Sequence, residues 1–281
     1  MKKKTAGDVT YKVIIYIVCI FLTILSIMPF WIMIVNSTRS TFQIQQHAVS
    51  LIPSTFFLKN LEILRGKSFN AMVGFVNSCT ISMGATFCAV YFSTLTAYAI
   101  VVYNWRARNA FFTFILAIMM IPTQVTAIGF YKFMYQIGMT NNFLALILPS
   151  IAAPATVFFM RQYMVPTLAI DIINAARIDG AGEFYTFNKI VLPIMKPAIA
   201  TQGIFTFVTA WNNLFLPLIL LTDNNKYTMP IMVSLLRGDI YKTEYGSIYL
   251  GLMLTVLPLF VVYFLLSKYI IAGVALGGVK G

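Results

Sequence analysis

Residues 174–193, NAARIDGAGEFYTFNKIVLP, form a polar segment within a chain that is otherwise largely apolar. The segment carries charges of both signs and two glycines, whereas long stretches on either side consist almost entirely of aliphatic and aromatic residues. Of the 281 residues, 59% are hydrophobic and 10% are charged, compared with about 25% charged residues in soluble domains. So few charges cannot cover a water-facing surface, and the composition therefore predicts an integral membrane protein.

The apolar stretches are long enough for membrane helices, which need about 20 predominantly apolar residues. Six stretches qualify, at 13–35, 75–103, 110–131, 143–160, 197–221 and 248–267. No succession of short alternating segments suggests a β-barrel. The first stretch exceeds the core of a cleavable signal peptide, so it is interpreted as an anchor. The predicted fold is all-α, with six transmembrane helices in a single domain over residues 1–281.

The distribution of lysine and arginine predicts the orientation of these helices. With the N-terminus inside, twelve of the 20 basic residues lie on the cytoplasmic side, which is the side that basic loops prefer. The predicted cytoplasmic parts are residues 1–12, the loop 161–196 and the tail 268–281. The quoted segment is then cytoplasmic as well.

The spans lack the groups that would power transport. They contain no Asp, Glu, Lys, Arg or His, apart from Lys132 at the outer edge of the third span, so a proton relay is not expected. The phosphate-binding pattern G-x-x-x-x-G-K-[ST] is also absent from the sequence. If the protein moves a solute uphill, another subunit must supply the energy through a cytoplasmic docking surface.

The spacing within residues 170–193 predicts such a surface. Apolar and polar residues alternate at helical spacing before Gly180, and Phe184 and Phe187 begin a second apolar stripe after Gly182. The two glycines permit a turn between the helices, and the second helix is expected to end before Pro193. The residues leave two alternatives open, a helix pair that docks on a partner or a helix pair that lies on the membrane surface.

Three separated motifs resemble a known family. The segments AARIDGAGEFYTFNKIVLPIMKPAIA, WNNLFLPLIL and AGVALGGVKG are similar to those of ATP-binding-cassette importer permeases, in the carbohydrate-uptake, maltose-permease-like branch. The resemblance covers nearly the whole chain and implies a type I importer permease fold with a coupling helix pair between helices 4 and 5. One position departs from the family pattern, because Asn174 stands where the family has glutamate. A charge-assisted bond to an ATPase at that position is therefore in doubt.

The resemblance also assigns roles to individual residues. The implied ATPase-coupling residues are Asn174, Ala175, Ala176, Asp179, Gly180, Ala181, Glu183 and Phe184. The implied residues of the C-terminal tail motif are Gly277, Gly278 and Lys280.

On the same resemblance, the expected partners are a second, similar permease, two ATPase subunits and an extracytoplasmic solute-binding protein. The chain itself would hold no cofactor, because ATP and magnesium would bind to the partner ATPase. The expected location is the plasma membrane of a bacterium or archaeon, with both termini in the cytoplasm. Nucleic acid is not an expected partner, because basic flanks that orient membrane helices account for the net charge of +12.

A pathway without buried charges suits an uncharged, hydroxyl-rich solute, such as a sugar held by amides, hydroxyls and aromatic faces. The candidate contacts in the spans are Asn77, Ser78, Thr123, Gln124, Thr126, Trp211, Asn212 and Asn213. An alternative assigns the same residues to bonds between helices.

Other functions fit the sequence less well. A phosphate ester such as glycerol phosphate is an alternative solute, although it would favour a cation in the pathway. A membrane-embedded enzyme would need a catalytic or metal constellation, and His47 is the single histidine of the chain. A passive channel would leave the cytoplasmic segment without a role.

Overall fold

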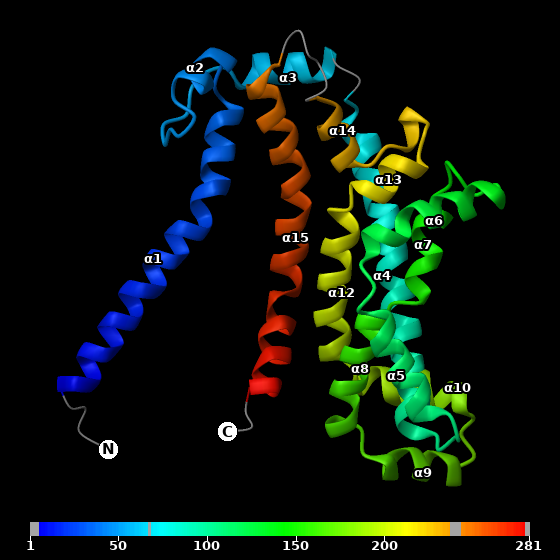
Figure 1. Cartoon of the computed structure of the whole chain (residues 1–281). Coiled ribbons are helices and arrows are strands. Elements are labelled where there is room, and N and C mark those ends of the chain that lie inside the picture. Colours follow the sequence, from blue (N-terminus) through cyan, green and yellow to red (C-terminus); the bar gives the residue numbers. More distant parts are fainter. Residues whose placement is uncertain (1–5, 67–68, 237–242, 279–281) are drawn as a thin grey trace. The chain divides into compact units, whose positions relative to one another are not determined.

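A computed structural model describes residues 6–66, 69–236 and 243–278, and within these ranges the chain is helical without strands (Figure 1). The helices form two compact units, each of which is described separately. The first unit comprises the described residues of Met1–Asn70 together with Val233–Val256, and the second comprises Ala71–Met232 together with the described residues of Leu257–Gly281. Nothing in this division tests the predicted single domain, which stays a prediction.

The first unit contains the helices at the two ends of the chain. Its elements are α1 (Ala6–Ser37), α2 (Thr41–Gln46), α3 (Phe57–Gly66), the end of α14 (Met229–Leu236) and the beginning of α15 (Tyr245–Gly278). Helix α1 is strongly apolar, and none of the residues in its most apolar part is buried within the structure. The side chains of this part therefore face lipid or another subunit, whereas Val35, Asn36 and Ser37 at the end of the helix are buried.

Buried polar contacts hold the connections of this unit together. Arg39 is 7% exposed and donates to the carbonyl oxygens of Gln43 at 2.9 Å and His47 at 2.7 Å, at the C-terminal end of α2. A cation at this end is favoured by the helix dipole, so the arginine is stabilised by carbonyl groups. Asn60 donates to the carbonyl oxygens of Ser37 at 2.8 Å and Arg39 at 2.9 Å.

The second unit contains the remaining helices. They are α4 (Ala71–Val102), α5 (Arg108–Ile118), α6 (Thr123–Gln136), α7 (Leu144–Ile147), the 3-10 helix η1 (Leu148–Ile151), α8 (Pro154–Thr167), α9 (Ile170–Ile178), α10 (Glu183–Thr186), the π-helix η2 (Phe187–Val191), α11 (Leu192–Ile194), α12 (Lys196–Trp211), α13 (Phe215–Leu220), the 3-10 helix η3 (Asn224–Lys226), the beginning of α14 and the remainder of α15.

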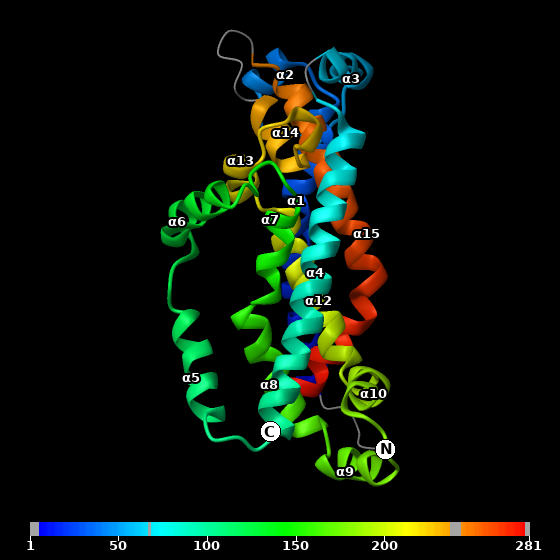
Figure 2. The same ribbon diagram turned by 90° about the vertical axis from the view of Figure 1, so that its right-hand side faces the viewer.

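Helix α4 is the centre of this unit, and α8 and α12 lie beside it (Figures 1 and 2). Small residues on α4 are almost fully buried, among them Ala85, Ala89 and Ala97 at 2%, 1% and 0% exposure. Small side chains let helix backbones approach closely, which is the usual basis of helix association in membranes. The sequence of α4 therefore explains why it can contact two neighbours along its length.

Most of the predicted spans correspond to long apolar helices. Among the described residues, four helical stretches are each long and apolar enough to cross a membrane, at Tyr11–Ser37, Ala71–Val102, Leu144–Thr167 and Tyr245–Phe264. A fifth is obtained if Glu183–Ile194 and Lys196–Trp211, which meet at 80°, are taken together. Pro29 and Pro258 lie within continuous helices, α1 and α15.

The prediction of one continuous third helix over 110–131 is wrong. Helix α5 ends at Ile118, and α6 begins only after Pro122, whose φ and ψ of −63° and 126° are extended. Proline cannot donate a backbone hydrogen bond and disfavours a helical residue before it, so the chain turns between the two helices. Helix α5 has 11 residues, a length of about 17 Å, and does not span an apolar core of about 30 Å by itself.

Three other predicted boundaries also differ. Helix α8 continues to Thr167, beyond the predicted end of the fourth span at 160. The fifth span, predicted over 197–221, is interrupted between Trp211 and Phe215. The second cytoplasmic helix does not end before Pro193, because this residue lies in the first turn of α11, where its missing N–H costs no helical bond.

Candidate functional site

The polar segment forms a bent structure between α8 and α12, which we call the elbow and define as residues 168–195. Helix α9 lies crosswise at one end of the second unit, and α10, η2 and α11 lead from it back to α12 (Figures 1 and 2). The predicted helix, glycine turn and second helix are therefore present.

The turn of the elbow is a Schellman motif that requires Gly180. This residue has φ of +80°, its N–H donates to the carbonyl oxygen of Arg177 at 3.1 Å, and the N–H of Ala181 donates to that of Ala176 at 2.9 Å. A side chain at Gly180 would meet no atom within 4 Å, so backbone conformation rather than space demands glycine. Gly182 has φ of −68°, which other residues adopt readily, and only Gly180 fulfils the predicted role of a glycine.

One face of the elbow is packed against the helices of the second unit. Ile173, Phe187 and Val191 are at most 1% exposed and belong to the same apolar cluster as Met160 and Met164 of α8. The predicted apolar stripe of the second helix is thus divided, because Phe187 is buried whereas Phe184 is exposed. The buried face couples the elbow mechanically to the helix bundle.

The opposite face carries large apolar side chains in the open. Ile178 is 87% exposed, Phe184 is 74% exposed and Tyr185 is 59% exposed. The proposed coupling residues Asn174 and Asp179 are exposed as well, whereas Ala176 is buried. An exposed apolar group with polar neighbours is typical of a surface that another protein or a membrane covers.

The carboxylate of Glu183 joins the elbow to the end of α4. Its Oε2 accepts hydrogen bonds from the hydroxyls of Tyr98 at 3.0 Å and Tyr103 at 2.5 Å, and its Oε1 accepts from Nε of Arg177 at 2.7 Å. We call these four residues the Glu183 cluster. The guanidinium of Arg177 also lies 5.4 Å from the ring centroid of Tyr103. The sequence indicated Glu183, but no spacing in it links the two tyrosines or Arg177 to this residue.

The same contacts shift the pKa values of Glu183 and Tyr103. The bond from Arg177 and, after it, the bond from Tyr103 lower the pKa of Glu183 from its ordinary value. Burial and the bond to Glu183 raise the pKa of Tyr103. Glu183 is therefore ionised and Tyr103 is protonated at neutral pH, which is the combination that the hydrogen bonds require.

We expect the elbow to loosen in acid because of this carboxylate. A lowered pKa in the folded state stabilises the fold above the pKa of the unfolded chain, and this stabilisation is lost as the pH falls through the folded-state value. In wild type, amide protection in α9 and α10, corrected for intrinsic exchange rates, should fall about threefold on acidification, the size expected of a partly exposed charge pair. Hydrogen exchange followed by mass spectrometry measures this protection.

The matched variant for this prediction is Glu183→Gln, which keeps the shape and an acceptor for Tyr103. Its protection at neutral pH should already equal that of the acidified wild type and should not change with pH in this range. Equal acid sensitivity in the two proteins would assign the loosening to another group.

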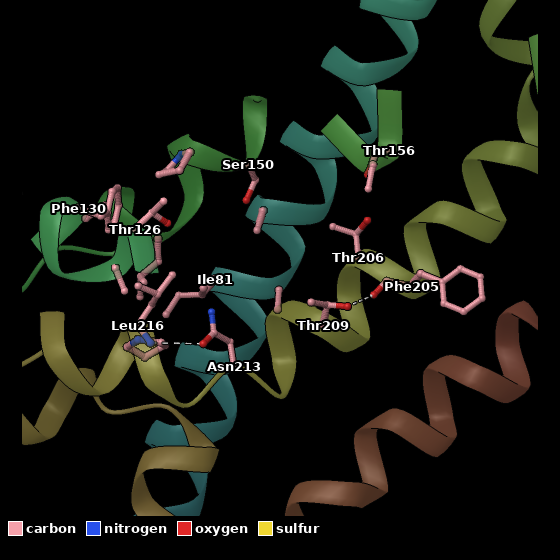
Figure 3. A pocket seen from close by; sticks show the side chains of 18 of the residues that line it. Ile81, Thr126, Phe130, Ser150, Thr156, Phe205, Thr206, Thr209, Asn213 and Leu216 are labelled. Atoms are coloured by element: carbon pink, nitrogen blue, oxygen red, sulfur yellow. Dashed lines mark hydrogen bonds between the residues drawn. The ribbon is translucent and has the colours of Figure 1, made fainter. Parts of the chain in front are cut away.

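A cavity of about 600 Å³ lies farther along the same helices (Figure 3). Its wall is formed by α4, α6, α7, η1, α8, α12 and α13, with Ile81 and Ala85 contributed by α4. Polar side chains in this wall are all uncharged hydroxyls and amides, namely Thr126, Ser150, Thr156, Gln202, Thr206, Thr209 and Asn213. No ionisable residue is among the described residues that line it.

The cavity contains only some of the predicted solute contacts. Thr126 and Asn213 line it, and Oδ1 of Asn213 accepts a bond from the N–H of Leu216 at 3.4 Å. Gln124 and Asn212 are exposed and lie outside its lining. The side chain of Thr123 lies outside the described residues.

Three other candidates serve the packing of the second unit. Asn77 donates to the carbonyl oxygens of Asn225 at 2.8 Å and Tyr227 at 3.0 Å. The hydroxyl of Ser78 accepts from the N–H of Met229 at 2.9 Å. Trp211 is 1% exposed and packs its ring between those of Phe75 and Phe207. These positions match the alternative role in helix contacts.

Sequence reasoning missed the polar face of α12. Gln202, Thr206 and Thr209 follow one another at intervals of four and three residues, so they lie on one side of α12, and the predicted contact Asn213 comes four residues later, just beyond the end of the helix. This polar stripe within an apolar span was the available signal. Of the predicted tail residues, Gly277 and Gly278 end α15, and Lys280 lies outside the described residues.

Comparisons with known proteins agree with this architecture. The model of a family described as "Binding-protein-dependent transport system inner membrane component" matches residues 89–275. The chain belongs to this family. It is therefore a multi-pass membrane permease, a transport subunit, and the predicted resemblance to importer permeases is confirmed.

Individual relatives extend over nearly the whole permease. A protein of Halalkalibacterium halodurans named an arabinooligosaccharides transport system permease protein is 33% identical over 283 aligned residues. The alignment covers 100% of this chain and 100% of that protein. A protein of Pectobacterium atrosepticum named an sn-glycerol-3-phosphate transport system permease protein is 28% identical, with 87% of this chain and 89% of the relative covered.

Among solved structures, a chain of a bacterial ABC transporter involved in the import of the acidic polysaccharide alginate matches with a TM-score of 0.80. The match covers 96% of this chain and 100% of that chain at 20% sequence identity, and therefore concerns the fold. The predicted importer-permease fold is thereby confirmed.

Proposed function

We propose that this permease forms part of the translocation pathway of an ATP-driven importer for uncharged sugars or oligosaccharides. The observation that carries the proposal is the uncharged cavity wall of hydroxyls and amides on the helices that also hold the elbow. Sugars are bound by such groups together with aromatic surfaces, and Phe130 lies in the wall. The names of oligosaccharide-transporting relatives support the same solute class.

Energy would reach the cavity through the elbow. Ile178, Phe184 and Tyr185 would enter a cleft on one of two cytoplasmic ATPase subunits, which would bind ATP and magnesium and catalyse the hydrolysis. Closure of the ATPase pair would move the elbow and, through its buried face and Glu183, the end of α4. Because α4 also carries Ile81 and Ala85 of the cavity wall, one helix would connect the docking surface to the solute pathway.

The rest of the assembly follows from the same proposal. A second, similar permease would complete the pathway, and a solute-binding protein would deliver the sugar on the extracytoplasmic side. The elbow would lie in the cytoplasm together with both termini, and the membrane would be a bacterial or archaeal plasma membrane. The position of Asn174 on the exposed face is compatible with a neutral hydrogen bond to the ATPase in place of the family's charged one.

A phosphate ester remains the alternative solute, because two relatives are named for glycerol phosphate. A phosphate dianion in an apolar pathway needs a cation or several aligned donors, and the second permease would have to supply the cation. Between the two classes, the uncharged cavity wall favours the sugar.

The experiment is uptake into vesicles that contain the permease, its companion permease and the ATPase, with the binding protein added outside. We expect ATP-dependent accumulation of radiolabelled arabinotriose or maltose to exceed that of glycerol 3-phosphate at least about tenfold, since an unpaired charge costs several kcal/mol in such a pathway. Preference for glycerol 3-phosphate would contradict the sugar assignment. Uphill accumulation by the permease without the ATPase would contradict the energy source.

A further inference from the structure

A second hollow lies in the connection between α4 and α5, away from the cavity and from the exposed face of the elbow. It has a volume of about 390 Å³ and is lined by Asn104, Trp105, Arg106, Arg108 and Asn109. Tyr103, the first residue after α4, begins this connection. Its hydroxyl donates a hydrogen bond to Glu183. The hollow therefore lies at the same end of the second unit as the elbow (Figure 2).

The hollow has the character of a phosphate-binding site. Neither Arg106 nor Arg108 forms an ion pair within the described parts of the chain, and the lining contains no carboxylate. The planar guanidinium group can donate two parallel bonds to a phosphate, and the amides of Asn104 and Asn109 offer further donors. Helix α5 begins at Arg108 without an acidic residue in its first turn or a capping side chain, so its positive end also favours an anion.

Apolar aromatic groups adjoin this polar lining. Phe111 is 40% exposed and Phe114 is 60% exposed, and their three-residue spacing places both on one side of α5. The ring of Trp105 contacts that of Phe111 at 5.8 Å between centroids, and tryptophan is enriched where membrane helices meet the headgroup region. A cationic hollow followed by an exposed aromatic face matches a ligand with an anionic head and an apolar tail.

We propose that this hollow binds the phosphate of an anionic phospholipid, whose acyl chains extend along Phe111 and Phe114. The absence of a carboxylate from the lining disfavours zwitterionic lipids, because nothing there would pair with their ammonium group. A bound lipid holds the connection between α4 and α5 at the membrane surface, and this connection includes Tyr103. The lipid thereby stabilises the segment against which the elbow is held.

The test is lipid binding by the purified full-length permease in detergent, measured by native mass spectrometry. Dioleoylphosphatidylglycerol should bind at least about tenfold more tightly than dioleoylphosphatidylcholine, because both arginines attract an anionic headgroup. The paired change Arg106→Gln with Arg108→Gln should abolish this preference, and the pair Arg106→Lys with Arg108→Lys should keep part of it, because lysine retains the charge but not the two parallel donors. Equal binding of the two lipids by wild type would overturn the proposal.

Two controls separate the site from net charge and from free phosphate. The pair Arg65→Gln with Lys132→Gln removes two exposed cations elsewhere and should leave the lipid preference intact; an equal loss would mean that total charge alone attracts the lipid. Phosphatidylglycerol should protect Arg106 and Arg108 from modification by phenylglyoxal, whereas 10 mM inorganic phosphate should not. Equal protection by phosphate would make the hollow a site for soluble anions and would overturn the lipid assignment.

Discussion

The variant Gly180→Pro should reduce ATP-driven uptake about 100-fold while the permease still inserts into the membrane. Proline fixes φ near −65°, whereas Gly180 has φ of +80°, and it removes the N–H that donates to Arg177. A penalty of about 3 kcal/mol for an incompatible proline corresponds to about 100-fold in the population of the native turn. Uptake of labelled sugar, normalised to the amount of permease in the membrane, measures the effect.

Two neighbouring variants serve as controls for this result. Gly180→Asn should retain most of the uptake, because asparagine adopts positive φ more readily than other side chains and meets no atom at this position. Gly182→Ala should be nearly neutral, because Gly182 has φ of −68° and open space around it. Normal uptake by Gly180→Pro, or equal losses in all three variants, would show that the geometry of this turn does not control transport.

The variant Thr206→Lys should lower uptake of a neutral sugar about 100-fold. It places an ammonium group in a cavity whose lining has no charge, and a lysine in the middle of a membrane helix costs about 2.5–3.5 kcal/mol. The amine would retain water or an anion in the space that the sugar must occupy. Initial uptake rates in vesicles, at matched permease content, measure the loss.

The control for the lysine is Thr206→Met, which adds a side chain of similar length without the charge. Expressed as a free energy, the loss of uptake rate in the methionine variant should be less than half of that in the lysine variant, since only volume and one hydroxyl change. The sign of the effect also tests the solute class, because a cation in the wall would assist an anionic solute. Faster uptake of glycerol 3-phosphate by Thr206→Lys than by wild type would support the phosphate ester.

The spans and the elbow could largely be predicted from local pattern. Length and hydrophobicity identify α1, α4 and α15 because these helices need no information beyond their own residues. The prediction of the third span failed because a proline in an apolar run can either kink a helix or end it, and the local sequence does not show which. At Pro122 the chain ends one helix and starts another, an outcome that depends on which neighbours satisfy the freed backbone groups.

The candidate solute contacts could be predicted only in part. Residue type and position in a span do not separate the packing residues Asn77, Ser78 and Trp211 from the cavity residues Thr126 and Asn213. Asn77 bonds to the chain near η3, and the rings of Trp211 and Phe75 meet edge to face, in pairings between positions distant in sequence. Only the packing of the helices in the second unit decides which polar groups remain available to a cavity.

By itself, the sequence determined that this protein lies in a membrane, that it is helical, and that one polar elbow interrupts its spans. These properties depend on composition and on spacing within single segments, where neighbouring residues share a helix face. Only the tertiary structure decided that Glu183 meets Tyr98 and Tyr103, and that Gln202, Thr206 and Thr209 face an uncharged cavity. The physical reason is that these contacts join segments far apart in the chain, and their formation depends on how whole helices pack.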